Sequence, residues 1–345
     1  SFFNINPKPN SIFKTMAVSI ADIQKLRKMT GAGLSDCKKA LTETEGNFDK
    51  AVEIIREKGQ AIAAKRSDRE TSNGCVLVKY ADNFGAIVAL KCETDFVANG
   101  ADYIKLTQDI LDAAVAAKAK SLDEVKELTL ADGTKVLDAV VARSGITGEK
   151  MELDGYNFIE GENISTYDHM GKHTLCTMVQ TNKAAEEQAH AIAMQVAAMK
   201  PMFLDEASVS QEFIEEEKKV AAEKTKQELV QKAVDAALKK AGINPAHVDS
   251  EEHMESNMGK GWITAEDVAK AKEIIATVSA EKAANLPAQM IENIVKGRIN
   301  RIYKENCLLN QEFIQDSKLS VADYLKAADK DLTVVDYKRF SLSAD

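Results

Sequence analysis

The sequence predicts an α+β fold, and three observations support this class. Residues 20–59 and 211–303 carry apolar side chains at helical spacing, whereas β-favouring runs begin near Gly74. A hairpin followed by a helix is indicated twice, at similar spacing. The 345 residues, 45% of them hydrophobic, are enough for two or three domains with packed cores.

The first region after the N-terminus is predicted to be a three-helix module. Residues 1–15 contain two prolines and no helical period, so we interpret them as a disordered or artificially added leader before Met16. Residues 16–59 form the module, in which glycine-rich breaks separate three amphipathic helices. We expect Ser35 to cap the second helix, Asn47 to cap the third and Gly59 to end it.

Residues 60–73 are predicted to be a linker. They include the charged run KRSDRE and show no apolar pattern after Ala64. We expect either a solvated tether or the fraying end of the preceding helix. A contact of this basic stretch with RNA is the less favoured alternative.

Two α+β halves are predicted to form the core. Residues 74–155 make the first half, in which the turn at residues 82–85 joins two strands and a helix follows. The second half comprises residues 156–210 and 304–345, with a turn at Met170, a strand, an alanine-rich helix that ends before Pro201, and a C-terminal strand. Gly85 precedes an Ala-Ala pair by nearly the same distance as Gly171 does, which indicates a repeated unit.

Residues 211–303 are predicted to be a helical arm. They are rich in Ala, Lys and Glu, their apolar residues recur at helical spacing, and Pro287 suits the first turn of the last helix. We expect an antiparallel, coiled-coil-like helical hairpin that projects from the core. A globular helical bundle is the alternative, and periodicity does not separate the two.

Composition excludes several functional classes. With 54 acidic and 45 basic residues, the net charge of −9 disfavours direct binding of nucleic acid. No stretch approaches the roughly 20 apolar residues of a membrane span. The five cysteines are scattered and never spaced as a CxxC pair, as expected of reduced thiols in a cytoplasmic protein.

The motifs of common enzymes are missing. No phosphate-binding P-loop, nucleophile elbow or HExxH motif occurs. The pair His169 and His173 flanks a turn without an acidic base, and His247 and His253 are expected in a solvated polar loop. We therefore predict no catalytic residue, no cofactor and no metal site.

Two short stretches resemble a known family. Residues 27–41 read RKMTGAGLSDCKKAL, and residues 93–98 read ETDFVA. Together they closely resemble translation elongation factor Ts, with support from IAMQVAA at 192–198 and IVKGR at 294–298. The resemblance runs from about Ser19 to the C-terminus. It implies that the N-terminal module is similar to ubiquitin-associated domains.

The resemblance implies a guanine-nucleotide exchange factor. The family binds elongation factor Tu in its GDP-bound and nucleotide-free forms and promotes GDP release, so that GTP can bind during translation elongation. Such a factor needs only differential affinity, because tighter binding to the nucleotide-free partner weakens GDP binding equally. A ubiquitin-binding adaptor is the alternative suggested by the three-helix module, and self-association is left open.

The resemblance also implies the residues that bind the partner. A magnesium dislocation loop would disturb the partner's magnesium site; it comprises Thr94, Asp95, Phe96 and Val97. In this loop Phe96 would insert into the partner and Asp95 would make polar contacts that help to fix the loop. Without the resemblance, core packing of Phe96 and Val97 is the favoured interpretation, because most aromatic side chains on loops fold inward.

Further contacts are implied in two other places. Arg27, Leu34 and Lys38 of the N-terminal module would contact the partner's nucleotide-binding domain, whereas Asp36 and Cys37 are expected to serve as cap and core. Gln195 would contact the partner from the second half, at a position where some family members have histidine.

Overall fold

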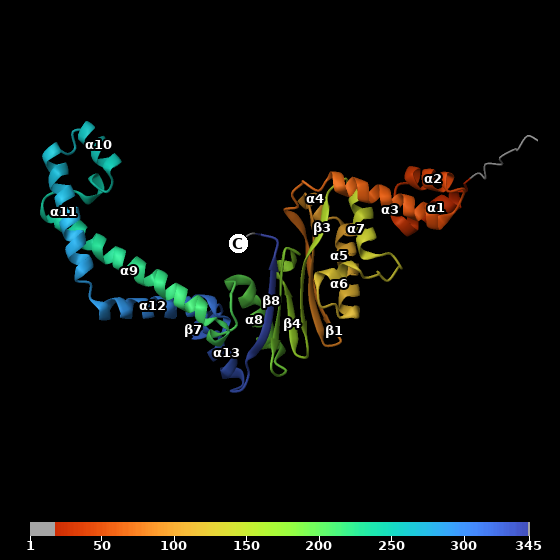
Figure 1. Ribbon diagram of the computed structural model, residues 1–345. Coiled ribbons are helices and arrows are strands. Elements are labelled where there is room, and N and C mark those ends of the chain that lie inside the picture. Colours follow the sequence, from red (N-terminus) through yellow and green to blue (C-terminus); the bar gives the residue numbers. More distant parts are fainter. Residues whose placement is uncertain (1–17, 344–345) are drawn as a thin grey trace, which may run out of the picture. The chain divides into compact units, whose positions relative to one another are not determined.

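The computed structural model describes residues 18–343, which contain helices and small antiparallel sheets (Figure 1). The described residues form two compact units. The first comprises those up to Lys200 together with those from Asp323, and the second is Pro201–Ala322. The leader predicted at residues 1–15 lies outside the described residues. The α+β class is confirmed.

Three helices form the N-terminal module, as predicted: α1 (Ile20–Thr30), α2 (Leu34–Glu43) and α3 (Phe48–Lys65). Leu26, Cys37 and Leu41 are fully buried between them. The side chain of Asn47 caps α3 by accepting a hydrogen bond from the Lys50 amide at 3.1 Å. The predicted cap at Ser35 is wrong, because α2 begins at Leu34 after the extended residue Gly33 and Ser35 already lies inside the helix.

The third helix does not end at Gly59. A β-carbon at Gly59 would lie 2.4 Å from the Val141 side chain, so this glycine permits close packing of α3 on the helix that carries Val141. Beyond Lys65 the chain is tied to the core rather than free. Arg66 donates to the Ser144 carbonyl at 2.9 Å, and Lys150 donates to the Ser67 carbonyl at 2.8 Å. The prediction of a free tether is therefore wrong, although residues 67–70 are exposed, and residues 60–65 continue the preceding helix, as the alternative prediction had it.

Two three-stranded antiparallel sheets form the centre of the first unit. The first has the order β1 (Asn73–Ala81), β2 (Phe84–Cys92) and β3 (Met151–Glu160), and the second has the order β4 (Ile164–Asp168), β5 (Leu175–Thr181) and β8 (Val334–Ser341). Asp82 and Asn83 both have positive φ in the predicted β1–β2 turn, as a two-residue type I′ turn requires. The predicted boundary between residues 155 and 156 is wrong, since β3 pairs with β2 as far as Glu160.

Each sheet carries a helix, as the repeated pattern predicted. Helix α5 (Ala101–Ala117) packs on β1 and β2, and α8 (Glu186–Met199) packs on β4 and β5. The other faces of the two sheets meet at Ile87, Ile159 and Met178. The remaining helices are α4 (Asp95–Ala98), α6 (Leu122–Lys126), α7 (Val136–Thr147) and α13 (Val321–Ala328), with a short 3₁₀ turn η1 (His169–Gly171). Helices α5, α6 and α7 cover the outer side of the first sheet (Figure 1).

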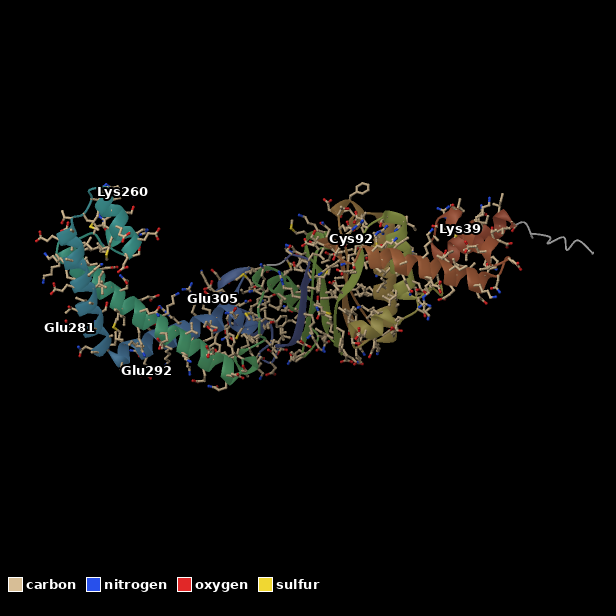
Figure 2. All side chains as sticks on the ribbon, turned by 45° about the horizontal axis from the view of Figure 1, so that its top comes forward. Lys39, Cys92, Lys260, Glu281, Glu292 and Glu305 are labelled. Atoms are coloured by element: carbon tan, nitrogen blue, oxygen red, sulfur yellow. The ribbon has the colours of Figure 1, made fainter. Side chains whose placement is uncertain are left out.

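The second unit is mainly helical. It contains η2 (Glu206–Ser208), α9 (Gln211–Lys240), η3 (Pro245–His247), α10 (Glu251–Gly259), α11 (Ala265–Ala284), α12 (Ala288–Asn306), η4 (Leu308–Asn310) and a small hairpin of β6 (Glu312–Phe313) and β7 (Asp316–Ser320). Helix α9 contacts both α11 and α12. Charged side chains such as Glu281, Glu292 and Glu305 extend from these helices, and Lys260 follows the end of α10 (Figure 2). The helical content is as predicted, while the coiled-coil-like geometry stays a prediction.

Two expectations for this unit are corrected. His253 does not lie in a polar loop, because Ser250 caps α10 and Met254 packs into an apolar cluster with Leu238 and Val268. The chain returns to the first unit at residue 323, whereas residue 304 was expected. Residues 304–322 belong to the second unit because they complete α12 and form the β6–β7 hairpin.

Candidate partner-binding site

The predicted dislocation loop is a single helical turn. Thr94 caps α4, its side chain accepting a hydrogen bond from the Val97 amide at 3.3 Å. Phe96 is 86% exposed, so its interpretation as a core residue is wrong. Val97 is half-buried and packs against the core of the first sheet, as its alternative interpretation predicted. The turn therefore exposes the Phe96 ring to solvent, while the neighbouring Val97 packs the backbone against the core.

An exposed phenylalanine alone is not evidence of binding, because single apolar side chains are common on protein surfaces. What distinguishes Phe96 is the support beneath it. The Glu149 carboxylate accepts hydrogen bonds from the Glu93 and Thr94 amides, both at 3.0 Å, and from the Thr94 hydroxyl. A ring held on a fixed backbone loses less conformational freedom when it binds.

Glu93 ties the same segment to the start of β3. Its carboxylate accepts a hydrogen bond from the Lys150 amide at 2.7 Å and another from Arg69 at 3.2 Å. The Lys150 hydrogen bond, followed by Arg69, lowers the pKa of Glu93. The Asn73 side chain donates to the Glu93 carbonyl at 3.0 Å. The sequence pattern predicts neither the role of Glu149 nor these contacts.

Asp95 differs from its neighbours. It is exposed, and within residues 18–343 its carboxylate makes no hydrogen bond or ion pair. The loop-fixing role expected of Asp95 is filled by Glu149 and Thr94. An unpaired carboxylate beside an exposed ring is left available to polar groups on another molecule.

The strand beneath the turn offers no nucleophile. Cys92 lies at the end of β2 (Figure 2) and donates a hydrogen bond to the Thr94 carbonyl at 3.2 Å. Burial raises the pKa of the Cys92 thiol to about 11 and that of Cys75 to about 12. Both thiols stay protonated near neutral pH, and thiols are weak nucleophiles in that form.

The N-terminal module exposes the three predicted side chains. Leu34 is 48% exposed in the first turn of α2, and Lys38 follows it one turn later on the same face. Arg27 is exposed in the last turn of α1, where Met29, not predicted as a surface residue, is also 45% exposed. Lys39 lies on the same helix as Leu34 and Lys38 (Figure 2).

Two further predictions for this module have different outcomes. Cys37 is buried in the core, as expected. Asp36 does not cap α2; its carboxylate pairs with Lys58 of α3 instead. Gln195, predicted as a contact from the second half, is buried on α8, so the structure does not support direct access of a partner to this side chain.

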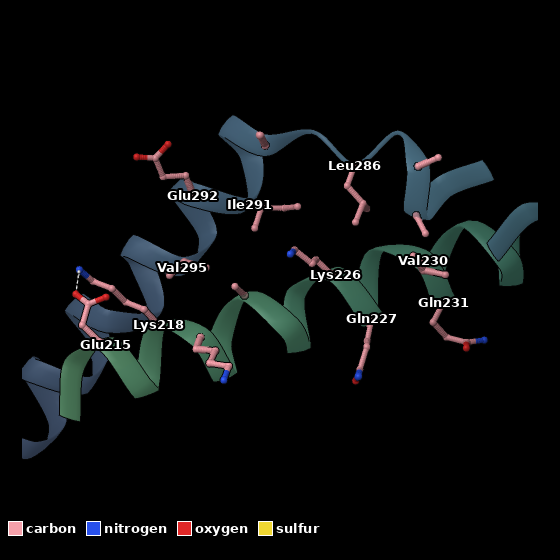
Figure 3. A pocket seen from close by; sticks show the side chains of 15 residues that line it. Glu215, Lys218, Lys226, Gln227, Val230, Gln231, Leu286, Ile291, Glu292 and Val295 are labelled. Atoms are coloured by element: carbon pink, nitrogen blue, oxygen red, sulfur yellow. Dashed lines mark hydrogen bonds and ion pairs between the residues drawn. The ribbon is translucent and has the colours of Figure 1, made fainter. Parts of the chain in front are cut away.

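A further hollow lies in the second unit, away from these residues in sequence. It is an open groove of about 1140 Å³ along α9, α11 and α12. Leu286, Ile291 and Lys226 point into the space between the helices, whereas Glu292 points away (Figure 3). Lys218 is paired with Glu215 at its end. The groove lacks buried acids, bases or nucleophiles, so it is a poor candidate for an active site.

No group of three His, Cys, Asp or Glu side chains within the described residues is placed to hold a metal ion. The expectation that no acid accompanies the pair His169 and His173 is wrong, because the His173 ring bonds to Asp168. His169 bonds to Tyr167 at 3.0 Å. Each histidine thus has its own partner rather than a shared ligand site. None of the described helices has the length and apolar character to cross a bilayer.

Comparison with known proteins identifies the family of the chain. The family model described as Elongation factor TS matches residues 93–344, so the match starts in the segment that carries Phe96. Elongation factor Ts of Bacteroides fragilis is 68% identical over 96% of this chain and all of its own length. The corresponding protein of Bacteroides thetaiotaomicron is 66% identical, and that of Porphyromonas gingivalis 43% identical, over the same shares. The chain belongs to the elongation factor Ts family.

Proposed function

We propose that this chain is a guanine-nucleotide exchange factor for elongation factor Tu that acts in the cytoplasm during translation elongation. It binds the GDP-bound form, promotes release of GDP and leaves the partner free to take up GTP. Family membership supports this function, and the observation that carries it is the exposed Phe96 on its anchored turn.

The proposed mechanism is differential binding. A factor that binds the nucleotide-free partner more tightly than the GDP-bound partner lowers GDP affinity by the same ratio. A 10⁴-fold effect requires about 5.5 kcal/mol of differential binding. One well-packed aromatic anchor supplies roughly 2 kcal/mol or more, so several contacts have to share the task.

We assign these contacts to two surfaces. Phe96 enters the partner near its magnesium site, and the unpaired Asp95 carboxylate beside it meets polar groups there. Arg27, Leu34 and Lys38 contact the nucleotide-binding domain from the N-terminal module. Displacing the magnesium ion weakens GDP binding because the ion neutralises phosphate charge. No step forms or breaks a covalent bond.

The test uses elongation factor Tu loaded with fluorescent GDP. Addition of this chain with excess unlabelled GDP is expected to speed loss of the signal, and a matched amount of albumin is expected to leave the spontaneous rate unchanged. Release at the spontaneous rate, with the chain folded by circular dichroism, would refute the proposed function. Acceleration that saturates with increasing chain concentration would support a bound complex.

A further inference from the structure

We propose that Glu149 is a positioning residue that holds the Phe96 turn in its binding geometry. This inference rests on the proposed exchange function. Glu149 lies beyond α7 in sequence, far from the motif it supports, and its carboxylate reaches the point where β2 gives way to α4.

Both oxygens of the carboxylate are used. Oε2 accepts hydrogen bonds from the Glu93 and Thr94 amides, at 3.0 Å each, and Oε1 accepts from the Thr94 hydroxyl. Hydrogen bonds to an ionised acceptor are roughly twice as strong as neutral ones. Three donors from two consecutive residues fix the backbone immediately before Asp95 and Phe96.

The tie is reciprocal. While Glu149 accepts the amides of Glu93 and Thr94, the Glu93 carboxylate accepts the Lys150 amide at 2.7 Å. Two adjacent pairs of residues therefore exchange side-chain-to-backbone hydrogen bonds in opposite directions. Such an arrangement opposes sliding of either segment along the other.

Glu149 itself is held by the end of α7. Gly148 adopts φ 79° and donates its amide to the Ser144 carbonyl at 2.9 Å, which ends α7 shortly before β3 begins. The Glu149 amide donates to the Thr147 hydroxyl at 3.3 Å, and the Ser144 hydroxyl donates to the Glu149 carbonyl. The carboxylate thus projects from a fixed backbone and not from a mobile loop.

The segment after α3 joins the same turn. Lys150 donates to the carbonyls of Ser67 and Arg69, and Arg69 donates to the Gly148 carbonyl at 3.2 Å. The connection from the N-terminal module and the Phe96 turn are therefore both fastened to residues 148–150. Loss of the Glu149 carboxylate removes the hydrogen bonds to Glu93 and Thr94 and leaves those of Lys150 and Arg69 in place.

The first test measures anchoring in the free protein. Glu149→Ala is expected to speed hydrogen exchange of the Glu93 and Thr94 amides at least tenfold, with overall unfolding little changed. Glu149→Gln keeps one side-chain oxygen as acceptor, and it is expected to retain most of the protection. Unchanged exchange of both amides in Glu149→Ala would overturn the inference.

The second test asks whether Glu149 acts through Phe96. Glu149→Ala is expected to slow GDP release from elongation factor Tu about tenfold at subsaturating chain, and by less than twofold when Phe96→Ala is already present. A full tenfold loss in both backgrounds would contradict positioning, because it would mean that Glu149 contributes independently of the ring. Glu149→Gln should restore most of the rate.

Glu160→Ala is the matched control. Glu160 stands at the opposite end of β3, where its carboxylate pairs with Lys120. Its loss is expected to leave amide exchange at residues 93–94 and GDP release unchanged; an equal effect there would refute the specific role of Glu149. If the parent chain itself failed to accelerate GDP release, the proposed exchange function would be refuted. The amide-exchange measurement would still test whether Glu149 anchors the turn.

Discussion

The two sheets of the first unit share a topology but differ where the central strand passes to its helix. In the first half, residues 93–100 join β2 to α5 and contain α4 with the exposed Phe96. In the second half, residues 182–185 join β5 to α8 without an intervening helix. The helical turn α4 is thus present in the first half and has no counterpart in the second.

The two sheets also share an equivalent hydrogen bond between connecting segments. Glu93 follows β2 and accepts the amide of Lys150, the residue before β3, at 2.7 Å. Asn182 follows β5 and accepts the amide of Thr333, the residue before β8, at 2.9 Å. Equivalent positions therefore join the second and third strands of each sheet. The proposed binding turn therefore lies in a connecting segment of an otherwise matched scaffold.

The largest effect is expected from forcing the two sheets apart. A β-carbon at Gly155 of β3 would lie 2.6 Å from the Ala89 side chain on the neighbouring strand β2. It would also lie 2.6 Å from the Phe340 ring of the second sheet. Gly155→Val should therefore destabilise the protein by roughly 3 kcal/mol in urea denaturation. Gly145→Ala is the control, because open space surrounds Gly145. A loss below roughly 1 kcal/mol would show that the sheets separate easily.

Phe96→Ala tests the added turn. We expect GDP release to slow about thirtyfold at subsaturating chain, since an aromatic anchor is worth about 2 kcal/mol of binding. Urea unfolding should barely change, because the ring is exposed. Met170→Ala is the control: Met170 is 68% exposed in the β4–β5 turn of the second half. A destabilised Phe96→Ala whose folded fraction exchanges normally would contradict the anchor.

The strand-to-helix hydrogen bonds test the equivalence of the halves. The Tyr103 hydroxyl of α5 donates to the Leu90 carbonyl of β2 at 2.6 Å, and the Thr177 hydroxyl of β5 donates to the Ala193 carbonyl of α8 at 2.7 Å. Both donors are buried. Tyr103→Phe and Thr177→Val should each cost about 1 kcal/mol in urea unfolding. A severalfold difference between the two losses of unfolding free energy would show that the equivalent hydrogen bonds contribute unequally to stability.

The smallest effect is the pH dependence of the hydrogen bond between Glu93 and Lys150 in the first half. The pKa of Glu93 is lowered in the folded chain, so its contribution to stability is present above the usual value near 4.5 and is lost as pH falls through the lower folded value. The Lys150 amide signal should follow this titration, whereas the Thr333 amide faces the uncharged Asn182.

Glu93→Gln supplies the control for this titration. Subtracting its stability-against-pH curve from that of the parent removes the other carboxylates, and the difference should fall only in the acidic window below about pH 4.5. A difference that grew above neutral pH would contradict the sign derived for Glu93.

Local sequence patterns predicted much of this fold. The Asp82–Asn83 turn, the apolar stripes of the helices and the return of β8 follow from preferences within a few residues of each other. Gly59 was misjudged because its reason is tertiary: the close approach of Val141 requires a glycine inside a helix. Helix α10 was missed because its buried face is short and its first turn is strongly acidic.

The candidate site was predicted only in part. Phe96 and its neighbours were found through a contiguous motif, and the structure then showed which of them face solvent. Glu149 carries no such signal, because its partners Glu93 and Thr94 lie far from it in the sequence. A single carboxylate after a glycine is also common. Support of this kind depends on three-dimensional proximity that periodicity does not encode.

The burial of all five cysteines has a practical consequence for spectroscopy. Reagents that modify thiols need the thiolate and physical access, and burial raises the pKa of Cys37, Cys92 and Cys307. A new cysteine at the exposed Asn99, which ends α4, would therefore take up a maleimide dye ahead of the native thiols. Such a dye, one residue beyond the buried Ala98, would report the encounter of the Phe96 turn with its partner in real time.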